Sequence, residues 1–162
     1  MSDGPVNADE LEWIEHDHGE RQFRRKQLSG AAGGEKLGTS LYEVPPGKRL
    51  WVRHYHEGNE ESIYVLDGSG TLWLGPEKTE HDLEAGDYVA LPPGEESAHD
   101  IEAGGDGLRV LMSGTMEEPD ITVYPDRDMV GLYAGSAPGG DSEARSLSTY
   151  LDRHAELDYW DD

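Results

Sequence analysis

The sequence predicts a single all-β domain that folds as a small barrel and carries a short C-terminal helix or arm. Three observations support this fold class. Short strand-like runs recur along most of the chain, glycines and prolines separate them at near-regular spacing, and 162 residues suffice for one domain with a core but hardly for two. Many short strands separated in this way are typical of a β-sandwich or barrel.

The elements follow in three stretches. Residues 1–20 are polar and acidic, and we expect a loosely ordered leader there. Residues 21–134 form the expected barrel. Its strand-like runs lie at 21–28, 36–44, 49–56, 62–67, 70–74, 79–83, 87–91, 97–103, 107–115 and 120–124. Residues 135–162 are expected to form a linker and a C-terminal packing segment, because 135–141 are rich in glycine, alanine and proline.

The C-terminal segment shows a helical spacing of large side chains. Four of them recur at i, i+3, i+4 and i+7: Leu147, Tyr150, Leu151 and His154. This spacing predicts a short helix, and an extended arm that packs on the barrel or on a partner subunit is the alternative. In either form the segment is rich in apolar groups for so acidic a stretch.

Histidines and a glutamate in the middle of the chain predict a metal site. His54 and His56 are two residues apart, so on a strand both imidazoles face the same side. Glu61 follows after a turn-like segment, and His99 opens a later strand-like run. Three imidazoles and one carboxylate suit one divalent transition-metal ion (Mn, Fe, Co, Ni, Cu or Zn) and leave coordination positions for water or substrate. Affinity should fall below about pH 6.5, where free imidazole protonates.

The carboxylate ligand has a rival in the neighbouring Glu60. Strand parity favours Glu61, because it would share a face with apolar Ile63 and Val65. The catalytic residues stay unassigned from the sequence. Three side chains near the ligands are candidates for proton transfer: Tyr42, Arg53 and Tyr64.

Other chemistry-bearing patterns are interpreted as structural. His16 and His18 imitate the His-x-His pair, but they lie in the polar leader, with no turn and no glutamate-bearing strand after them. We therefore expect them to be solvated. Residues 30–34 are glycine-rich but lack the Lys-Ser/Thr of a phosphate-binding loop, which indicates a flexible loop.

The ligand pattern resembles the two motifs of the cupin superfamily. The resemblance to the first motif rests on Gly47, His54-x-His56, Glu61 and Gly68, and that to the second on Gly86, Pro92-x-Gly94 and His99. The spacing departs slightly, with six residues rather than five between Gly47 and His54. The resemblance implies a double-stranded β-helix, a jelly-roll-like barrel, with the metal in its mouth. Small single-domain prokaryotic cupins are the most similar group.

Cupins include dioxygenases, decarboxylases, isomerases, ligand sensors and storage proteins, so the resemblance fixes a class rather than a reaction. It implies a metal-dependent enzyme that acts on a small oxygenated metabolite by oxygenase, decarboxylase or isomerase chemistry. A non-catalytic module that binds or senses a sugar or an organic acid is the alternative. Small cupins commonly form homodimers, and we expect one here.

The charge balance is strongly acidic. Aspartate and glutamate number 35 against 13 lysines and arginines, which gives a net charge of −22. A nucleic-acid partner is disfavoured, because phosphate binding needs a basic surface. Repulsion of this size opposes the compact state, and molar salt screens it by shortening the Debye length to about 3 Å. The composition thus predicts adaptation to a salt-rich cytoplasm, as in a halophile, with an ordinary acidic surface as the alternative.

Further features limit the class of protein. The chain has no cysteine, which excludes disulfides and thiolate zinc sites. No run approaches the roughly 20 apolar residues of a membrane span, and residues 1–5 lack the features of a signal peptide. We expect a cytoplasmic protein without a membrane partner.

Overall fold

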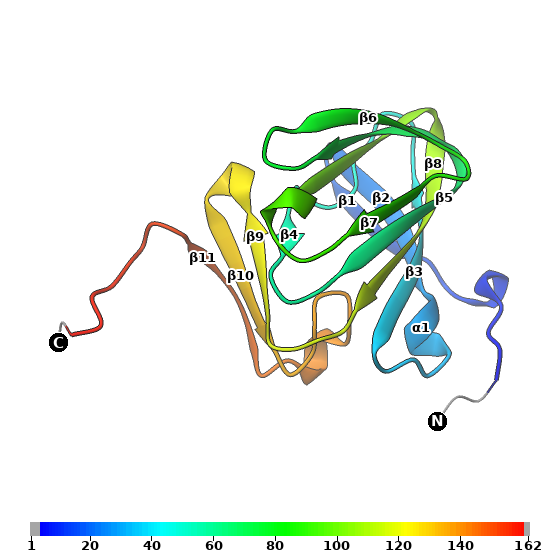
Figure 1. The fold of residues 1–162 in the computed structure, drawn as a ribbon. Coiled ribbons are helices and arrows are strands. Elements are labelled where there is room, and N and C mark those ends of the chain that lie inside the picture. Colours follow the sequence, from blue (N-terminus) through cyan, green and yellow to red (C-terminus); the bar gives the residue numbers. More distant parts are fainter. Residues whose placement is uncertain (1–3, 161–162) are drawn as a thin grey trace.

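The computed structural model describes residues 4–160, which form two antiparallel sheets (Figure 1). Eleven strands are present in this part of the chain: β1 Ile14–His18, β2 Arg21–Gln27, β3 Leu37–Val44, β4 Tyr55–His56, β5 Glu61–Leu74, β6 Thr79–Glu84, β7 Tyr88–Leu91, β8 His99–Thr115, β9 Asp120–Tyr124, β10 Met129–Ala134 and β11 Leu147–Asp152. The larger sheet has the order β1-β2-β3-β8-β5-β6, with β7 paired to β5, and the smaller has the order β11-β10-β9-β4. The all-β prediction is confirmed.

Helical structure is limited to single turns. These are α1 Leu28–Ala31 and the 3₁₀ turns η1 Ala8–Glu10, η2 Glu95–Ser97, η3 Pro125–Arg127 and η4 Ser142–Ala144. None of the helices in residues 4–160 has the length and apolar character needed to cross a membrane.

The main core lies within the larger sheet, whose strands supply nearly all of its side chains, and strand alternation builds it. On β5, Ile63 and Val65 are buried while Tyr64 and Leu66 are exposed. The buried side chains of β5 join others from β2, β3, β6, β7 and β8 in one cluster. Burying a side chain such as Val or Ile contributes about 1.5–3 kcal/mol relative to leaving it exposed. The apolar interior therefore fixes the register of β5, and with it the inward direction of Glu61 at its start.

Two long strands replace four expected short ones. β5 runs through the expected break at 68–69, and β8 runs through the expected break at 104–106. The pairing of β5 with β8 shifts register around Val65–Gly70. Gly68 has a φ of +82°, and a Cβ there would collide with the carbonyl oxygen of Gly107. The glycines that the sequence analysis interpreted as turns thus produce a bend within continuous strands.

The N-terminal leader is more ordered than expected. Ile14–His18 pair with Arg21–Arg25 as a hairpin, and the ring of His16 stacks on Phe23 with centroids 4.7 Å apart. β1 is mostly exposed on both faces. Its sequence therefore lacks the apolar alternation of a half-buried strand, and its conformation depends on pairing with β2.

Of the two forms expected for the C-terminal segment, a helix or an extended arm, the structure shows the extended one. Leu147–Asp152 form β11, which pairs with β10, and the expected strand at 49–56 is reduced to β4. Four side chains at helical spacing are too few to outweigh the open edge of β10, which β11 covers. After β11 the chain extends away from both sheets (Figure 1), and Leu157 and Trp160 are 94% and 85% exposed.

Candidate metal centre

The four predicted ligands come together at one end of the barrel. His54 and His99 face each other across an antiparallel bridge, with backbone N–O distances of 3.3 and 3.0 Å and ring centroids 4.6 Å apart. His56 follows on β4, and its two-residue offset from His54 brings both rings to the same side, with centroids 5.1 Å apart. Glu61 opens β5 opposite Gly114 of β8.

The carboxylate of Glu61 is the point on which the imidazoles converge. Its Oε2 atom lies 3.4 Å from Nε2 of His56, 3.7 Å from Nε2 of His99 and 3.8 Å from Nε2 of His54. Metal–ligand bonds of about 2.0–2.2 Å allow at most about 4.4 Å between two ligand atoms. All three distances fall within that limit. Glu60 is exposed and does not face the cluster, so the structure brings Glu61, not its rival, to the imidazoles.

The other ring nitrogen of each histidine is already engaged. Nδ1 of His54 and Nδ1 of His99 lie 2.7 and 2.9 Å from backbone carbonyl oxygens two residues earlier in the chain. A carbonyl oxygen only accepts, so each Nδ1 donates its proton and leaves the Nε2 lone pair directed at Glu61. Such outer hydrogen bonds fix ring orientation in metal sites.

His56 has a different partner, Asp120, which the sequence analysis missed. Oδ2 of Asp120 lies 2.6 Å from Nδ1 of His56, and Oδ1 accepts from the backbone N–H of Gly58 at 3.1 Å. The carboxylate is almost fully buried at the start of β9, where Thr122 also approaches His56 at 3.2 Å. A single aspartate far along the chain has no spacing relative to the His-x-His pair that would reveal this contact.

Two buried atoms in the cluster have no hydrogen-bond partner within residues 4–160. These are Oε2 of Glu61 and Nε2 of His99. Leaving a buried polar group unsatisfied costs about 1–3 kcal/mol. A cation bound between them would remove that cost, and the donor set of imidazole nitrogens and one carboxylate suits a first-row transition metal. The cluster of His54, Glu61 and His99 could hold a metal ion, with His56 beside it.

Burial and neighbouring charges set the protonation of the cluster. Burial, reinforced by the nearby imidazoles, lowers the pKa of His54 to about 3, and burial also lowers the pKa of His99. For His56, burial lowers the pKa, but the hydrogen bond with Asp120 and the nearby Glu61 carboxylate outweigh it and raise the pKa to about 10. Burial likewise disfavours ionised Glu61, but the neighbouring His56 holds the pKa of its carboxyl well below the usual range.

Cation binding at neutral pH should release about one proton per ion. His56 is protonated below its pKa of about 10, and a ligand nitrogen must be deprotonated, so the ion displaces the Nε2 proton. Lower pH favours the proton, so apparent affinity should fall about tenfold per pH unit across the neutral range. Metal affinity is therefore expected to depend on pH well above about 6.5, the pKa of free imidazole. Titration calorimetry in two buffers of different ionisation enthalpy measures the released protons.

The control for this prediction is Asp120→Asn, which removes a charge that raises the His56 pKa. It should lower both the number of released protons and the slope of affinity against pH. A wild-type release close to zero at neutral pH would contradict the prediction.

A cavity of about 610 Å³ adjoins the cluster, within the size range of small-molecule sites. His54, His56 and Glu61 lie in its wall, together with Tyr42. Its aromatic side also includes three hydrogen-bonded phenols: Tyr124, Tyr133 and Tyr150.

Of the three proton-transfer candidates, only Tyr42 lines this cavity. Arg53 is buried elsewhere, bound to the Gly75 carbonyl oxygen and to Asp126, and Tyr64 lies on the outer face of β5.

Residues 40–114 match the Cupin domain family. This match covers a little under half of the chain, so residues 40–114 are similar to a cupin domain. The matched region includes all four predicted ligands, and the two sheets agree with a cupin barrel. The family match therefore supports the resemblance inferred from the two motifs, which is confirmed at the level of the fold.

Relatives of known name agree with this assignment. Quercetin 2,3-dioxygenase of Bacillus subtilis is 30% identical over 84 residues, which cover 49% of this chain and 24% of that protein. The chain thus spans about a quarter of the length of this curated relative. A sugar phosphate isomerase of the cupin superfamily from Silicibacter pomeroyi has a TM-score of 0.75 at 22% identity, with 94% of both chains covered. KdgF from Halomonas sp. has a TM-score of 0.57 at 21% identity, over 69% of this chain and 94% of that one. At these identities the solved structures show the fold.

Proposed function

We propose that the chain is a metal-dependent enzyme acting on a small oxygenated metabolite, with one divalent transition-metal ion held by His54, His56, Glu61 and His99. The observation that carries the proposal is the convergence of these side chains, two of them with unpartnered buried atoms, beside a ligand-sized cavity whose wall includes His54, His56 and Glu61. The ion would supply Lewis-acid activation of a substrate oxygen, and redox chemistry if it is iron or copper.

A hydrogen-bonded row of tyrosines lines the cavity beside the cluster. Tyr124 lies beside His54, with ring centroids 5.9 Å apart, and its hydroxyl is 3.3 Å from that of Tyr133. Burial raises the pKa of Tyr124 to about 12, so its phenol stays protonated at neutral pH. Tyr133 in turn donates to the hydroxyl of Tyr150 at 2.9 Å. Since the one proton of Tyr133 goes to Tyr150, Tyr124 donates its own proton to Tyr133 and can accept a hydrogen bond from a substrate hydroxyl near the metal.

The named relatives support an enzyme without choosing its reaction. One is a dioxygenase, another a sugar phosphate isomerase and a third, oxalate decarboxylase of Bacillus subtilis, matches in fold with a TM-score of 0.54. Oxygenase, isomerase and decarboxylase chemistry all use substrates with neighbouring oxygen atoms, which a metal with open positions can bind.

A second candidate is a non-catalytic module that binds or senses a sugar or an organic acid. Apart from the four proposed ligands, the ionisable side chains in the described cavity wall are tyrosines and arginines. Their ordinary pKa values lie far above 7. Apart from the proposed ligands, the described wall therefore offers no ordinary general base at neutral pH. A protein that binds its ligand without turnover needs no such base.

Elemental analysis of protein purified from its native host, without chelators, tests the proposal and separates the candidates. We expect one transition-metal ion per chain. Iron or copper together with dioxygen consumption would favour oxygenase chemistry, and zinc without turnover would favour the binding module. A protein that carries no stoichiometric transition metal would contradict the metal centre itself.

We also propose a homodimer in which the C-terminal arm contacts the partner subunit. Leu157, Tyr159 and Trp160 lie exposed beyond β11, and β11 itself is a sheet edge with Tyr150 56% exposed. Apolar groups gathered in this way usually mark an interface. Sedimentation in molar KCl should give twice the chain mass of 17.9 kDa.

Truncation of the arm tests its part in the dimer. A chain that ends after His154 keeps β11 paired with β10 and loses only the exposed arm. It should dissociate at protein concentrations where the full chain remains dimeric. A truncated chain that is as dimeric as the full one would show that the arm does not hold the subunits together.

A further inference from the structure

We propose that the cavity beside the metal centre binds an anionic group of the substrate, a phosphate or a carboxylate, through Arg25, while Arg127 and Arg145 add positive charge to the cavity wall. This inference rests on the proposed function and narrows its substrate class. The substrate would present oxygen atoms to the metal at one side of the cavity and its anionic group to the guanidinium groups.

The charge of the cavity wall is opposite to that of the chain. The chain carries 35 acidic and 13 basic residues, yet the described wall contains three arginines and one carboxylate, that of Glu61. Glu61 is turned toward the imidazoles. The arginines therefore face the cavity without a carboxylate of their own. Charges beyond about 10 Å are screened at moderate salt, so the local arginines rather than the distant acidic surface decide what binds.

The arginines of the cavity also differ from the others in their partners. Five of the remaining six form ion pairs with carboxylates: Arg21, Arg24, Arg49, Arg53 and Arg109. Within residues 4–160, no such pair involves Arg25, Arg127 or Arg145. Three arginines that lack a carboxylate partner in the described chain thus meet in the wall of one cavity, where an anion from outside the chain could reach them.

Arg25 gives the clearest sign of a missing partner. It lies on β2 opposite Tyr42 of β3, with its guanidinium 5.7 Å from the centre of the Trp51 ring. Its Nε is buried and has no hydrogen-bond partner in the described chain. A buried donor on a cation is costly to leave unpaired. An anion accepting from Arg25 would satisfy it, and the planar guanidinium suits the two oxygens of a phosphate or carboxylate.

Arg127 and Arg145 come from opposite ends of β10 and add two more positive charges to the wall. Arg145 follows η4, and its Nε and Nη2 donate to the backbone carbonyl oxygens of Ser136 and Ala137 at 3.3 and 3.1 Å. These bonds, and the Tyr133 ring 5.1 Å away, hold the guanidinium in place and leave Nη1 free for a ligand. Arg127 ends η3 and is exposed, so it can reach an anion that enters from solvent.

Three sugars of similar size and different charge test the inference: D-glucose 6-phosphate, D-gluconate and neutral D-glucose. Calorimetry with the full metal-loaded chain should show at least one anion binding about tenfold or more tightly than glucose, since charge-assisted hydrogen bonds contribute roughly that much. The phosphate and carboxylate probes show which anion the arginines prefer. Equal affinities for charged and neutral sugars, or no anion binding at millimolar concentration, would overturn the inference.

Arg25→Gln and its neighbour Arg24→Gln form the matched pair. Both remove one positive charge from β2, but Arg24 faces away from the cavity and pairs with Glu43 at 2.6 Å. Arg25→Gln should abolish most of the preference for the anion, and Arg24→Gln should keep it. Equal losses in both variants would mean a general charge effect and overturn the inference. If Arg25→Gln does not fold, Arg127→Gln replaces it, because that side chain is exposed and unpaired.

Metal content measured on the same samples keeps this result separate from the proposed function. An anion preference that depends on Arg25 in a chain without stoichiometric metal would support the arginine site and contradict the metal centre. A metal-loaded chain whose anion preference does not change in Arg25→Gln would support the metal centre and contradict the arginine site.

Discussion

Replacing any of His54, His56 or His99 with alanine should lower metal affinity by more than about hundredfold, because losing even an outer-shell partner typically costs about 10–100-fold. Each replacement removes one nitrogen from the group that surrounds Oε2 of Glu61. Metal content of the purified variants, compared with wild type, measures the loss. A His54→Ala/His56→Ala double variant that keeps one ion per chain would contradict the proposed site.

Two matched controls are available on the chain itself. Glu61→Gln should reduce metal content far more than Glu60→Gln, because only Glu61 faces the imidazoles. A His16→Ala/His18→Ala variant removes the other His-x-His pair, which lies on β1. Its metal content should match that of wild type. A larger effect from Glu60 than from Glu61 would transfer the carboxylate role to Glu60.

The proximity of the four proposed ligands could be predicted from the sequence because its signals are local. The same-side placement of His54 and His56 follows from strand parity, and the apolar side chains of β5 fix the inward face of Glu61. The cupin motifs added His99, which backbone pairing brings beside His54. No local sequence pattern predicts the role of Asp120, because its contact with His56 joins residues 64 apart and depends on the pairing of β9 with β4.

The strands that the sequence did not predict, β1 and β11, also depend on contacts between distant residues. β1 and β11 are strands because β2 and β10 offer them open edges, not because their own side chains alternate. Their burial patterns are largely exposed, so periodicity could not reveal them. The unpaired arginines of the cavity were equally hidden, since a sequence shows which charges exist but not which of them find partners.

Thermal stability should depend steeply on salt. We expect the melting temperature to rise by about 10 °C between about 0.1 M and about 2 M KCl, which corresponds to about 3 kcal/mol for a chain of this size. The reason is the excess of 35 acidic over 13 basic residues, whose mutual repulsion salt screens. Calorimetry at several KCl concentrations measures the slope. A flat profile would contradict adaptation to high salt and leave an ordinary acidic surface.

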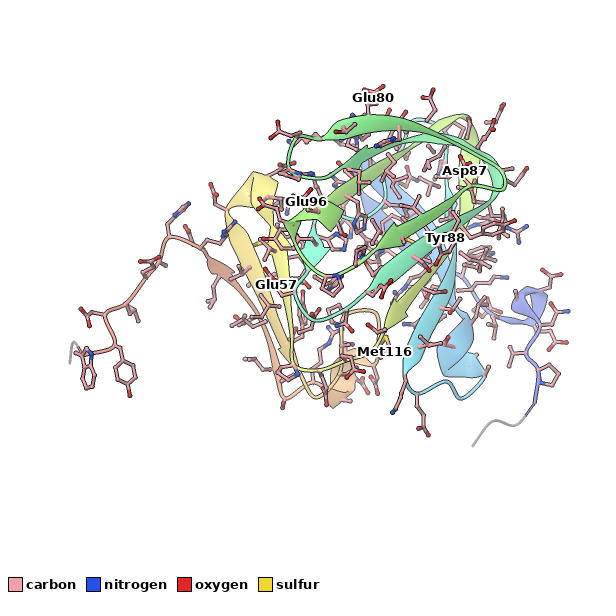
Figure 2. All side chains as sticks on the ribbon, viewed as in Figure 1. Glu57, Glu80, Asp87, Tyr88, Glu96 and Met116 are labelled. Atoms are coloured by element: carbon pink, nitrogen blue, oxygen red, sulfur yellow. The ribbon has the colours of Figure 1, made fainter. Side chains whose placement is uncertain are left out.

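A charge variant separates screening from the general effect of salt on apolar burial, which also raises stability. Glu57, Glu80 and Glu96 project from the surface (Figure 2), and within residues 4–160 they form no ion pair. Replacing all three with glutamine removes repulsion while keeping side-chain size. The variant should be more stable than wild type at low salt and nearly equal to it at molar salt, so the two curves should converge. If the melting temperatures of the two proteins rise in parallel with salt, the salt effect comes from apolar burial, and charge screening does not explain it.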